Sequence, residues 1–492
     1  MLFNSHEFVF LFLPFTLLGY GLCMRLGYGR STMGESGGMQ GSKNIKEIWT
    51  RLPGIFLLVM SFIFYAWNSP KYLPILLGSM AVNFVISRKR NLLVPGLLFN
   101  LGMLCGFKYL GQDGFFPLAI SFYTFTQIAF LVECYRGNVK NKDFLSYGLY
   151  VAYFPKMIQG PIALPEEISL EQRGANWEEI YRNLYLFVLG LFKKVLIADT
   201  FGKAVELGYG NLAALNSLDG VIVMLAYTLQ LYFDFSGYCD MAMGISGMLG
   251  IRLPLNFHSP YKAANILEFW KGWHITLTRF FTKYVYIPLG GNRKGRGRTY
   301  ANTLIVFFLS GIWHGTGIQF IVWGMMHGAL YVLTRAFMDT DLYKRFRDWR
   351  ESRGGITRAA IHGIAVLGTF LYVNVAWIFF RAPSVKEAGM LLGTILGRKG
   401  GRLNWELAGC FNLDEFWYVI KVLHLDRWQY AHYICMVMIL ASVLLLVFFG
   451  KTAVDYVKTV KPKPLHILIM AVLFIWSVLS FSGVSSFLYV NF

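Results

Sequence analysis

The stretch LSGIWHGTGIQF (residues 309–320) places one histidine, His314, inside a run that is otherwise largely apolar. Ionisable side chains are costly within a bilayer, so a histidine there is by default a functional-site hypothesis. Basic segments flank the stretch, namely RKGRGR at 293–298 and the connection from Arg335 to Arg358. Cytoplasmic loops carry an excess of Lys and Arg, so we expect both segments in the cytosol. The chain between them must therefore enter the membrane and return.

This returning hairpin is short, because only residues 301–334 separate the two basic segments. Two full crossings need about 40 residues at a rise of 1.5 Å each, plus a turn. Helical residues 301–313 rise about 20 Å, which ends beyond the bilayer midplane but short of the far surface. Gly315 and Gly317 predict a helix-breaking turn beside His314. Backbone of that kind is tolerated at such depth only where it is buried in protein or lines a water-filled cavity.

The composition of the whole chain is typical of a membrane protein. Of its 492 residues, 55% are hydrophobic and 15% charged, and the mean hydropathy is +0.48. Apolar runs recur at close to the ~20 residues that a membrane helix needs, and they form about eleven to thirteen hydrophobic segments. We therefore predict an all-α polytopic membrane protein. With no internal repeat, a single membrane domain over residues 1–492 is the simplest organisation.

The positions of the cations predict the orientation. The connections after the first, third and fifth apolar spans are basic, and they include Arg88 to Arg90, Lys140 and Lys142. Alternate loops share this bias, so the N-terminus is expected outside. The net charge of +19 then arises mostly from cytoplasmic loops that face anionic lipid, and no nucleic-acid partner is needed to explain it.

The cysteines give no sign of a metal site. All six are far apart and form no C-x-x-C pair. This spacing favours small buried hydrophobic residues over metal ligands or disulfides.

A second histidine, His274, lies in FWKGWHITLTRFFTKYVYIPLGGNRKG at 269–295. Aromatic residues, cations and threonines are too dense here for a span that faces lipid. The pattern predicts an interfacial helix on the cytosolic side, with four aromatic side chains at headgroup level: Trp270, Trp273, Tyr284 and Tyr286.

Three further ionisable residues lie in apolar context. Asp234 and Asp240 are six residues apart, or about 240° around a helix, so they do not form a paired-carboxylate site. We expect each to hold helices together through its own Tyr, Ser or Arg partner. For His327 we expect a packing role.

Four motifs in this order resemble the core of the membrane-bound O-acyltransferases, or MBOAT family, and in particular the alginate O-acetyltransferase (AlgI-like) branch. They fall at about 231–334, as YFDFSGYCDMAMG (232–244), PLNFHSPYKAANILEFWKGWHITLTRF (254–280), YIPLGGNRKG (286–295) and GIWHGTGIQFIVWGMMHG (311–328). The resemblance implies a central tunnel in which His314 is catalytic and in which His274, the second recurrent histidine, also takes part in catalysis, by positioning or relay. The alternative for His274 is a residue of the interfacial helix that hydrogen-bonds to a carbonyl. Lys271-Gly272 stands where many relatives have two arginines, and Lys283 where aspartate is frequent.

The resemblance also implies the substrates. An acetyl group would pass from cytosolic acetyl-CoA to a hydroxyl of a secreted polysaccharide, or through an extracytoplasmic SGNH-type partner, in the membrane of a bacterial cell. The turn that carries Asn292, Arg293 and Lys294 could bind the phosphates of coenzyme A, or be a plain basic loop. No resident cofactor is expected.

The chemistry of such a transfer needs a base and hydrogen-bond donors. Neutral imidazole accepts the proton of a hydroxyl near neutral pH, which is the role expected of His314. Either Trp indoles or backbone N–H groups at the Gly-flanked turn would stabilise the oxyanion.

Two alternatives stay open. In the first, the same machinery transfers D-alanine from a carrier-protein thioester to teichoic acid. A transporter or flippase would instead use the histidine and the two aspartates as a proton relay. Thioester cleavage that depends on His314 separates the enzymes from the transporter.

Overall fold

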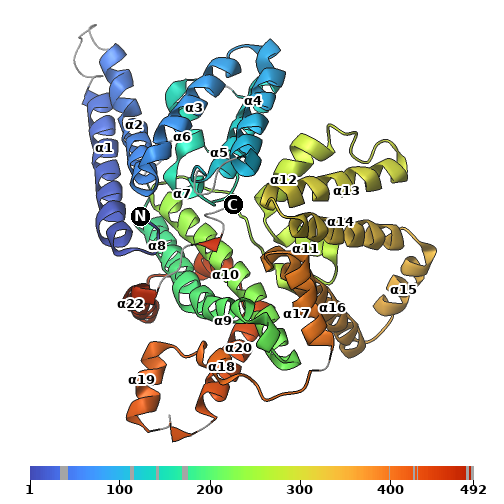
Figure 1. Cartoon of the computed structure of the whole chain (residues 1–492). Helices are drawn as coiled ribbons and strands as arrows, with labels where there is room; N and C mark the ends of the chain where they lie inside the picture. Colours follow the sequence, from blue (N-terminus) through green and yellow to red (C-terminus); the bar gives the residue numbers. More distant parts are fainter. Residues whose placement is uncertain are drawn as a thin grey trace. The chain divides into compact units, whose positions relative to one another are not determined.

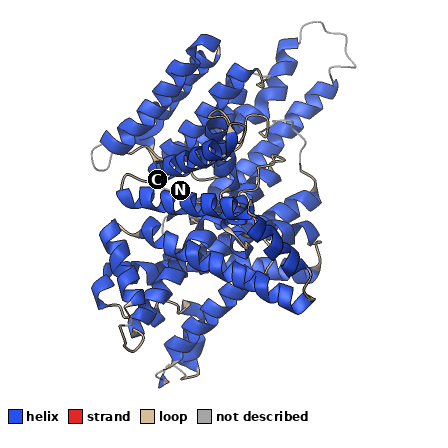
Figure 2. Cartoon of the chain, turned by 90° about the vertical axis from the view of Figure 1, so that its right-hand side faces the viewer, coloured by secondary structure: helices blue, strands red, loops and turns tan. Residues whose placement is uncertain are grey.

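The computed structural model describes residues 1–33, 43–110, 116–139, 143–168, 175–397, 399–424, 427–428, 430–483 and 487–488. Within these ranges every regular element is a helix, as predicted for an all-α membrane protein (Figures 1 and 2). Lys140 and Lys142, which contributed to the predicted orientation, lie outside the described residues.

The chain divides into two compact units. The first comprises Met1–Lys194, Phe235–Pro254 and Ala453–Phe492, and the second comprises Val195–Asp234 and Leu255–Thr452. The chain passes from the second unit back to the first within one continuous helix, α10 (Ser217–Met248). The single domain over residues 1–492 stays a prediction.

The first unit is built from the N-terminal helices and the last two of the chain. These are α1 (Leu13–Met33), α2 (Lys43–Asn68), α3 (Leu73–Ser87), α4 (Leu93–Cys105), α5 (Ile120–Arg136), α6 (Phe144–Ala152), α7 (Phe154–Met157), α8 (Trp177–Phe192), α21 (Ala453–Thr459) and α22 (Pro464–Leu479). Buried amides join three of them, because the Gln127 side chain of α5 accepts from Asn83 of α3, which in turn accepts from Asn100 of α4. Such bonds satisfy polar groups that the apolar interior would otherwise leave without partners.

The second unit holds the two histidines of interest. Its helices are α9 (Asp199–Gly210), α11 (Ile266–Gly272), α12 (Ile275–Phe281), α13 (Gly295–His314), α14 (Ile318–Met338), α15 (Asp341–Glu351), α16 (Gly355–Arg381), α17 (Val385–Leu396), α18 (Trp405–Gly409), α19 (Asp414–Val422) and α20 (Ala431–Phe449). Short π-helical segments include Phe8–Phe12 in the first unit and Thr282–Tyr286 in the second. A further one, Lys193–Ala198, contains the boundary between the units.

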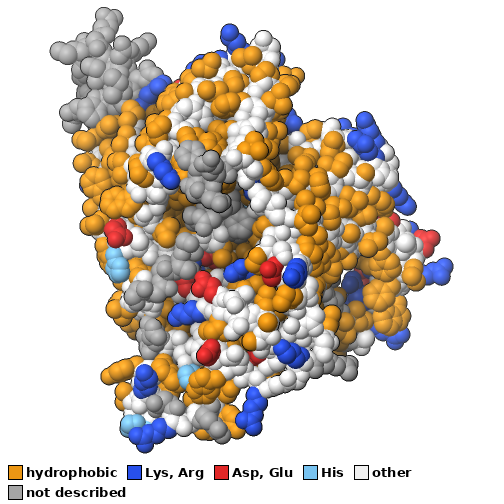
Figure 3. Space-filling model, viewed as in Figure 1, with side chains coloured by type: hydrophobic (Ala, Val, Ile, Leu, Met, Phe, Trp, Pro, Cys, Tyr) orange, Lys and Arg blue, Asp and Glu red, His pale blue; other side chains and the backbone are white. Residues whose placement is uncertain are grey.

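Seven helical stretches of the described chain are long and apolar enough to cross a membrane. They are Phe8–Leu26, Arg51–Asn68, Arg90–Leu110, Ser217–Met248, Ile318–Met338, Gly355–Arg381 and Ala431–Phe449. Shorter apolar helices such as α3, α5 and α22 account for other hydrophobic segments of the sequence. Hydrophobic side chains cover continuous stretches of the visible surface (Figure 3), as expected of helices that face lipid.

The hairpin of α13 and α14 turns where the sequence predicts. Helix α13 ends at His314, Gly315 is extended, and α14 begins after Gly317. The start differs, since α13 already begins at Gly295 inside the basic segment rather than at residue 301. Glycine lets the two helices touch, because a Cβ at Gly311 would overlap the carbonyl oxygen of Phe320. In the same way, a Cβ at Gly324 would overlap the carbonyl oxygen of Phe307.

Candidate active site

His274 lies at a break between two short helices. The predicted interfacial helix over 269–295 is wrong as a single element, because α11 ends at Gly272 and α12 starts at Ile275. His274 itself has a φ of 44°, a left-handed conformation that is uncommon outside glycine and frequent at functional sites. Backbone bonds from a segment earlier in the chain hold the break, since the His258 N–H donates to Gly272 O and the Ile275 N–H donates to Asn256 O.

Two tryptophans that were expected to face the lipid headgroups are buried inside the protein. Trp270 and Trp273 are only 7% and 2% exposed. Trp273 packs against Phe257, Phe269 and Trp377, with ring centroids 4.9–5.7 Å apart. Aromatic pairs at these distances stabilise a protein interior, so the break turns these indoles inward.

A buried amide orients His274. Its Nδ1 lies 3.1 Å from Asn256 Oδ1, which also accepts from the backbone N–H and the hydroxyl of Thr276. Because the Thr276 N–H can only donate, Asn256 Oδ1 is an acceptor, and His274 Nδ1 carries the proton. The lone pair is then on Nε2. Burial lowers the pKa of His274 to about 3, so the ring is neutral at physiological pH.

His314 is the last residue of α13 and is 3% exposed. Three rings surround it, with centroids 4.7 Å away for Trp313, 5.0 Å for Trp323 of α14 and 5.0 Å for Phe380 of α16. The base candidate therefore lies in an aromatic enclosure built by three helices. Sequence reasoning did not single out Trp323 or Phe380.

The two predicted histidines come together around one indole. The Trp313 ring centroid is 6.4 Å from that of His274 and 4.7 Å from that of His314. His274 and His314 are 40 positions apart along the chain, and α13 and the break at residue 274 bring them to the same region. A shared site for His274 and His314 is consistent with this arrangement.

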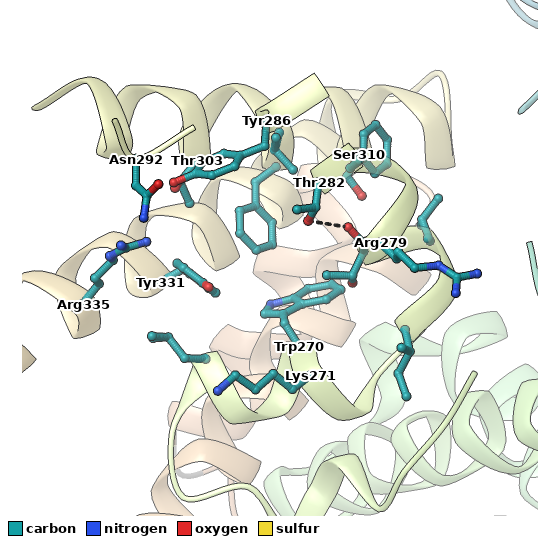
Figure 4. A pocket seen from close by; sticks show the side chains of 17 residues that line it. Trp270, Lys271, Arg279, Thr282, Tyr286, Asn292, Thr303, Ser310, Tyr331 and Arg335 are labelled. Carbon is teal, nitrogen blue, oxygen red and sulfur yellow. Dashed lines mark hydrogen bonds between the residues drawn. The ribbon is translucent and has the colours of Figure 1, made fainter. Parts of the chain in front are cut away.

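A pocket of about 520 Å³ lies beside this site, lined by residues from α11 through α14 (Figure 4). Trp270 and Phe307 contribute apolar wall, and Ser310 lies one helical turn before His314. Cations and polar groups also line it, namely Lys271, Arg279, Tyr286, Asn292 and Arg335. In Figure 4, Arg335 and Asn292 lie at one end and Arg279 at the other.

The three residues considered above for phosphate binding do not all line the pocket. All three are exposed, and Asn292 lines the pocket, whereas Arg293 and Lys294 are not among its lining residues. Sequence reasoning missed Lys271, Arg279 and Arg335 as pocket residues, because they come from three different helices. Only the fold brings these cations to one cavity.

The aspartates and His327 are buried. Asp240 forms an ion pair with Lys193, at 2.6 Å between Oδ2 and Nζ, so the expected Tyr, Ser or Arg partner is wrong for this residue. Lys193 lies at the start of the π-helical segment that follows α8, and its long side chain reaches Asp240. Asp234 is 1% exposed, and His327 is fully buried among aromatic rings. In the described part of the chain, no group of three or more His, Cys, Asp or Glu residues could hold a metal ion.

Comparison with known proteins places this site in a family. Residues 112–379 match the model of the membrane-bound O-acyltransferase family, MBOAT. A peptidoglycan O-acetyltransferase of Helicobacter pylori is 35% identical over 458 residues, which cover 81% of this chain and 80% of the relative. A probable alginate O-acetylase AlgI of Pseudomonas aeruginosa is 31% identical over 424 residues, or 79% and 73% of the two chains. A teichoic acid D-alanyltransferase of Bacillus subtilis is 30% identical over 226 residues, or 43% and 57%.

The chain belongs to the membrane-bound O-acyltransferase family, as its four motifs predicted. It is therefore a polytopic membrane enzyme of the acyltransferase class, with relatives in bacteria.

Proposed function

We propose that the protein is an O-acetyltransferase that carries an acetyl group from cytosolic acetyl-CoA to a hydroxyl of a cell-envelope or secreted polysaccharide. Delivery is direct or through an extracytoplasmic SGNH-type partner. The named activities of the relatives that cover most of the chain, on peptidoglycan and alginate, support this class of acceptor. The observation that carries the proposal is the buried His314, which shares Trp313 as a neighbour with His274. The His314 ring also contacts Trp323, which contacts Trp270 in the wall of a pocket lined by cations.

In the proposed reaction, His314 acts as the general base. It takes the proton of the acceptor hydroxyl while the hydroxyl oxygen attacks the carbonyl carbon of the thioester. The C–S bond then breaks, and the proton passes from His314 to the leaving thiolate, so that free coenzyme A and an acetyl ester result. His274 is proposed as a positioning residue, held by Asn256 and next to Trp313.

The pocket is proposed to receive the donor. Lys271, Arg279 and Arg335 provide positive charge for the phosphates of coenzyme A, and Trp270 and Phe307 provide apolar surface for the thioester arm. Arg335 lies in the last turn of α14, at the end of the hairpin that the basic segments predict to be cytosolic. The proposal also includes a passage that leads from this pocket across the membrane. It further includes an orientation of the chain in which the N-terminus is outside.

Cleavage of radiolabelled acetyl-CoA by the purified protein in nanodiscs tests the proposal. We expect His314→Ala to lower the release of free coenzyme A by about 10²–10⁴-fold, which is the range for loss of a general base. His362→Ala is the matched control, because this histidine is exposed on α16, and its activity should equal that of the wild type. Equal thermal unfolding of all three proteins shows that the fold is intact. A folded His314→Ala protein with full activity would contradict the assignment.

D-Alanyl transfer is a second candidate, because the teichoic acid D-alanyltransferase of Bacillus subtilis matches 43% of the chain. A D-alanyl carrier protein is offered to the same nanodiscs in place of acetyl-CoA. If the protein cleaves the carrier thioester and leaves acetyl-CoA intact, the donor is the D-alanyl carrier protein and not acetyl-CoA.

A further inference from the structure

A third histidine lies in a cluster of three rings that the mechanism above does not use. The ring centroid of His327 is 5.1 Å from that of Trp270 and 5.2 Å from that of Trp323, and the two indoles are 6.0 Å apart. Trp270 of α11 is 7% exposed, and Trp323 and His327 of α14 are 1% and 0% exposed. They form the Trp270–Trp323–His327 cluster.

The polar atoms of this cluster are buried without hydrogen-bond partners. In the described part of the chain this holds for both ring nitrogens of His327 and for the indole nitrogens of Trp270 and Trp323. A buried donor or acceptor left unsatisfied costs about 1–3 kcal/mol. Several such groups in one small region are expensive, so each unsatisfied group calls for a ligand or an ordered water as explanation.

Counting donors and acceptors identifies the chemistry of the ligand. Each indole offers one N–H donor, and a neutral imidazole offers one donor and one acceptor. Donors therefore outnumber acceptors by three to one. A carbonyl oxygen, which accepts two hydrogen bonds and more strongly when it carries negative charge, matches such a set.

The cluster lies between the pocket and the base. Trp270 lines the pocket (Figure 4). The Trp323 ring, in turn, is 5.0 Å from the His314 ring. By contrast, the Gly315 N–H at the turn already donates to the Gly311 carbonyl oxygen. The Gly315 N–H is thus engaged, whereas the indole N–H groups of Trp270 and Trp323 are not.

We propose that the indole N–H groups of Trp270 and Trp323, with His327, hold the acyl carbonyl oxygen and stabilise the oxyanion into which it turns. This inference rests on the proposed acetyl transfer. When the hydroxyl oxygen attacks the carbonyl carbon, the C=O electron pair moves to oxygen, and the cluster donates to that oxyanion. The pair returns as the C–S bond breaks, and the thiolate takes the proton from His314. Donors aimed at developing charge act mainly on the transition state.

The test separates hydrogen bonding from packing. We expect Trp323→Phe and His327→Phe, which keep a ring but remove its N–H, to lower kcat about 10²–10³-fold, the range for one lost oxyanion donor. The KM for acetyl-CoA should change less than about threefold, because the contact strengthens only in the transition state. His327→Gln keeps an N–H donor and should recover most of kcat.

His432→Phe is the matched control. This histidine packs against Trp405 and Trp417, with ring centroids 4.0 and 4.3 Å away, but its Nδ1 has the Asn412 amide as partner. It should retain wild-type kcat. Folded Trp323→Phe and His327→Phe proteins with unchanged kcat, or with a raised KM alone, would overturn the cluster's role. The activity of His314→Ala tests the proposed function separately, so that failure would leave the proposed function unaffected.

A second measurement does not depend on these variants folding. Acetyl-CoA labelled with ¹³C at the carbonyl is bound to the inactive His314→Ala protein, and the infrared carbonyl stretch is recorded. Hydrogen bonds from the cluster should lower its frequency relative to free acetyl-CoA. A bound carbonyl with an unshifted frequency refutes the inference, whereas failure of acetyl-CoA to bind refutes the proposed donor.

Discussion

A single amide oxygen organises the environment of His274. Asn256 Oδ1 accepts from the His274 ring, from the Thr276 backbone and from the Thr276 hydroxyl, all in a buried setting. This arrangement fixes both the orientation of the ring and which nitrogen carries the proton. A histidine held in this way is suited to position a reacting group rather than to rotate freely.

Removing this oxygen should therefore lower activity without touching a histidine. We expect Asn256→Ala to reduce kcat by about 10–100-fold, because an unsatisfied buried donor costs about 1–3 kcal/mol and each 1.4 kcal/mol is tenfold. Release of coenzyme A in nanodiscs measures the effect. Thr276→Val removes only one hydroxyl donor to the same oxygen and should stay within a few-fold of the wild type. Equal loss in both variants would argue against a positioning role.

At this scale the sequence identified individual residues better than their surroundings. His314 and His274 stand out because they are polar residues in recognisable motifs of an apolar chain. Asn256, Trp323 and Phe380 do not, because buried amides and aromatic residues are frequent in any membrane interior. Their importance comes from distances to residues remote in sequence, which no local pattern contains.

At the scale of elements, two features of the second unit differ in how far the sequence predicts them. The turn after His314 follows from Gly315 and Gly317, which end α13 locally. The break at His274 depends instead on backbone bonds from residues 256 and 258. Local composition over 269–295 favoured one helix, and tertiary bonds overrode that preference.

The close approach of α13 and α14 gives a test of the hairpin. We expect Gly324→Ala to destabilise the protein by about 1–3 kcal/mol, as for an overpacked core, because the new Cβ would overlap a backbone oxygen. Activity should fall with it, since the hairpin carries His314. Gly363→Ala on α16 is the control, because a Cβ there meets nothing within 4 Å. Thermal unfolding in nanodiscs reports both, and an unchanged melting temperature for Gly324→Ala would contradict the packing argument.

At the scale of the molecule, composition was enough to predict a helical membrane protein but not its division into two compact units. Each unit combines segments that are distant in the chain, and the boundary cuts through α10. Hydropathy reports which segments are apolar, and it carries no information on which of them pack together.

The orientation of the chain leads to a further prediction. In a variant without native cysteines, Ser352→Cys should be protected from a membrane-impermeant maleimide in intact cells and labelled in inside-out vesicles. Ser352 is exposed in the basic connection after α15, which the excess of Arg predicts to be cytosolic. Glu7→Cys, exposed near the N-terminus, should show the opposite pattern. Labelling of both from the same side would refute the predicted topology.

The contact between α13 and α14 also bears on how substrates enter. Most helix pairs are separated by side chains that change rotamer and cushion small movements, but at Gly311 and Gly324 backbone meets backbone. Such a pair has no layer of flexible side chains between its backbones. We therefore expect α13 and α14 to behave as one rigid unit, with His314 held at its turn. The break at His274 is held as well, by backbone bonds from residues 256 and 258, so the substrates enter a site in which both histidines are already fixed in place.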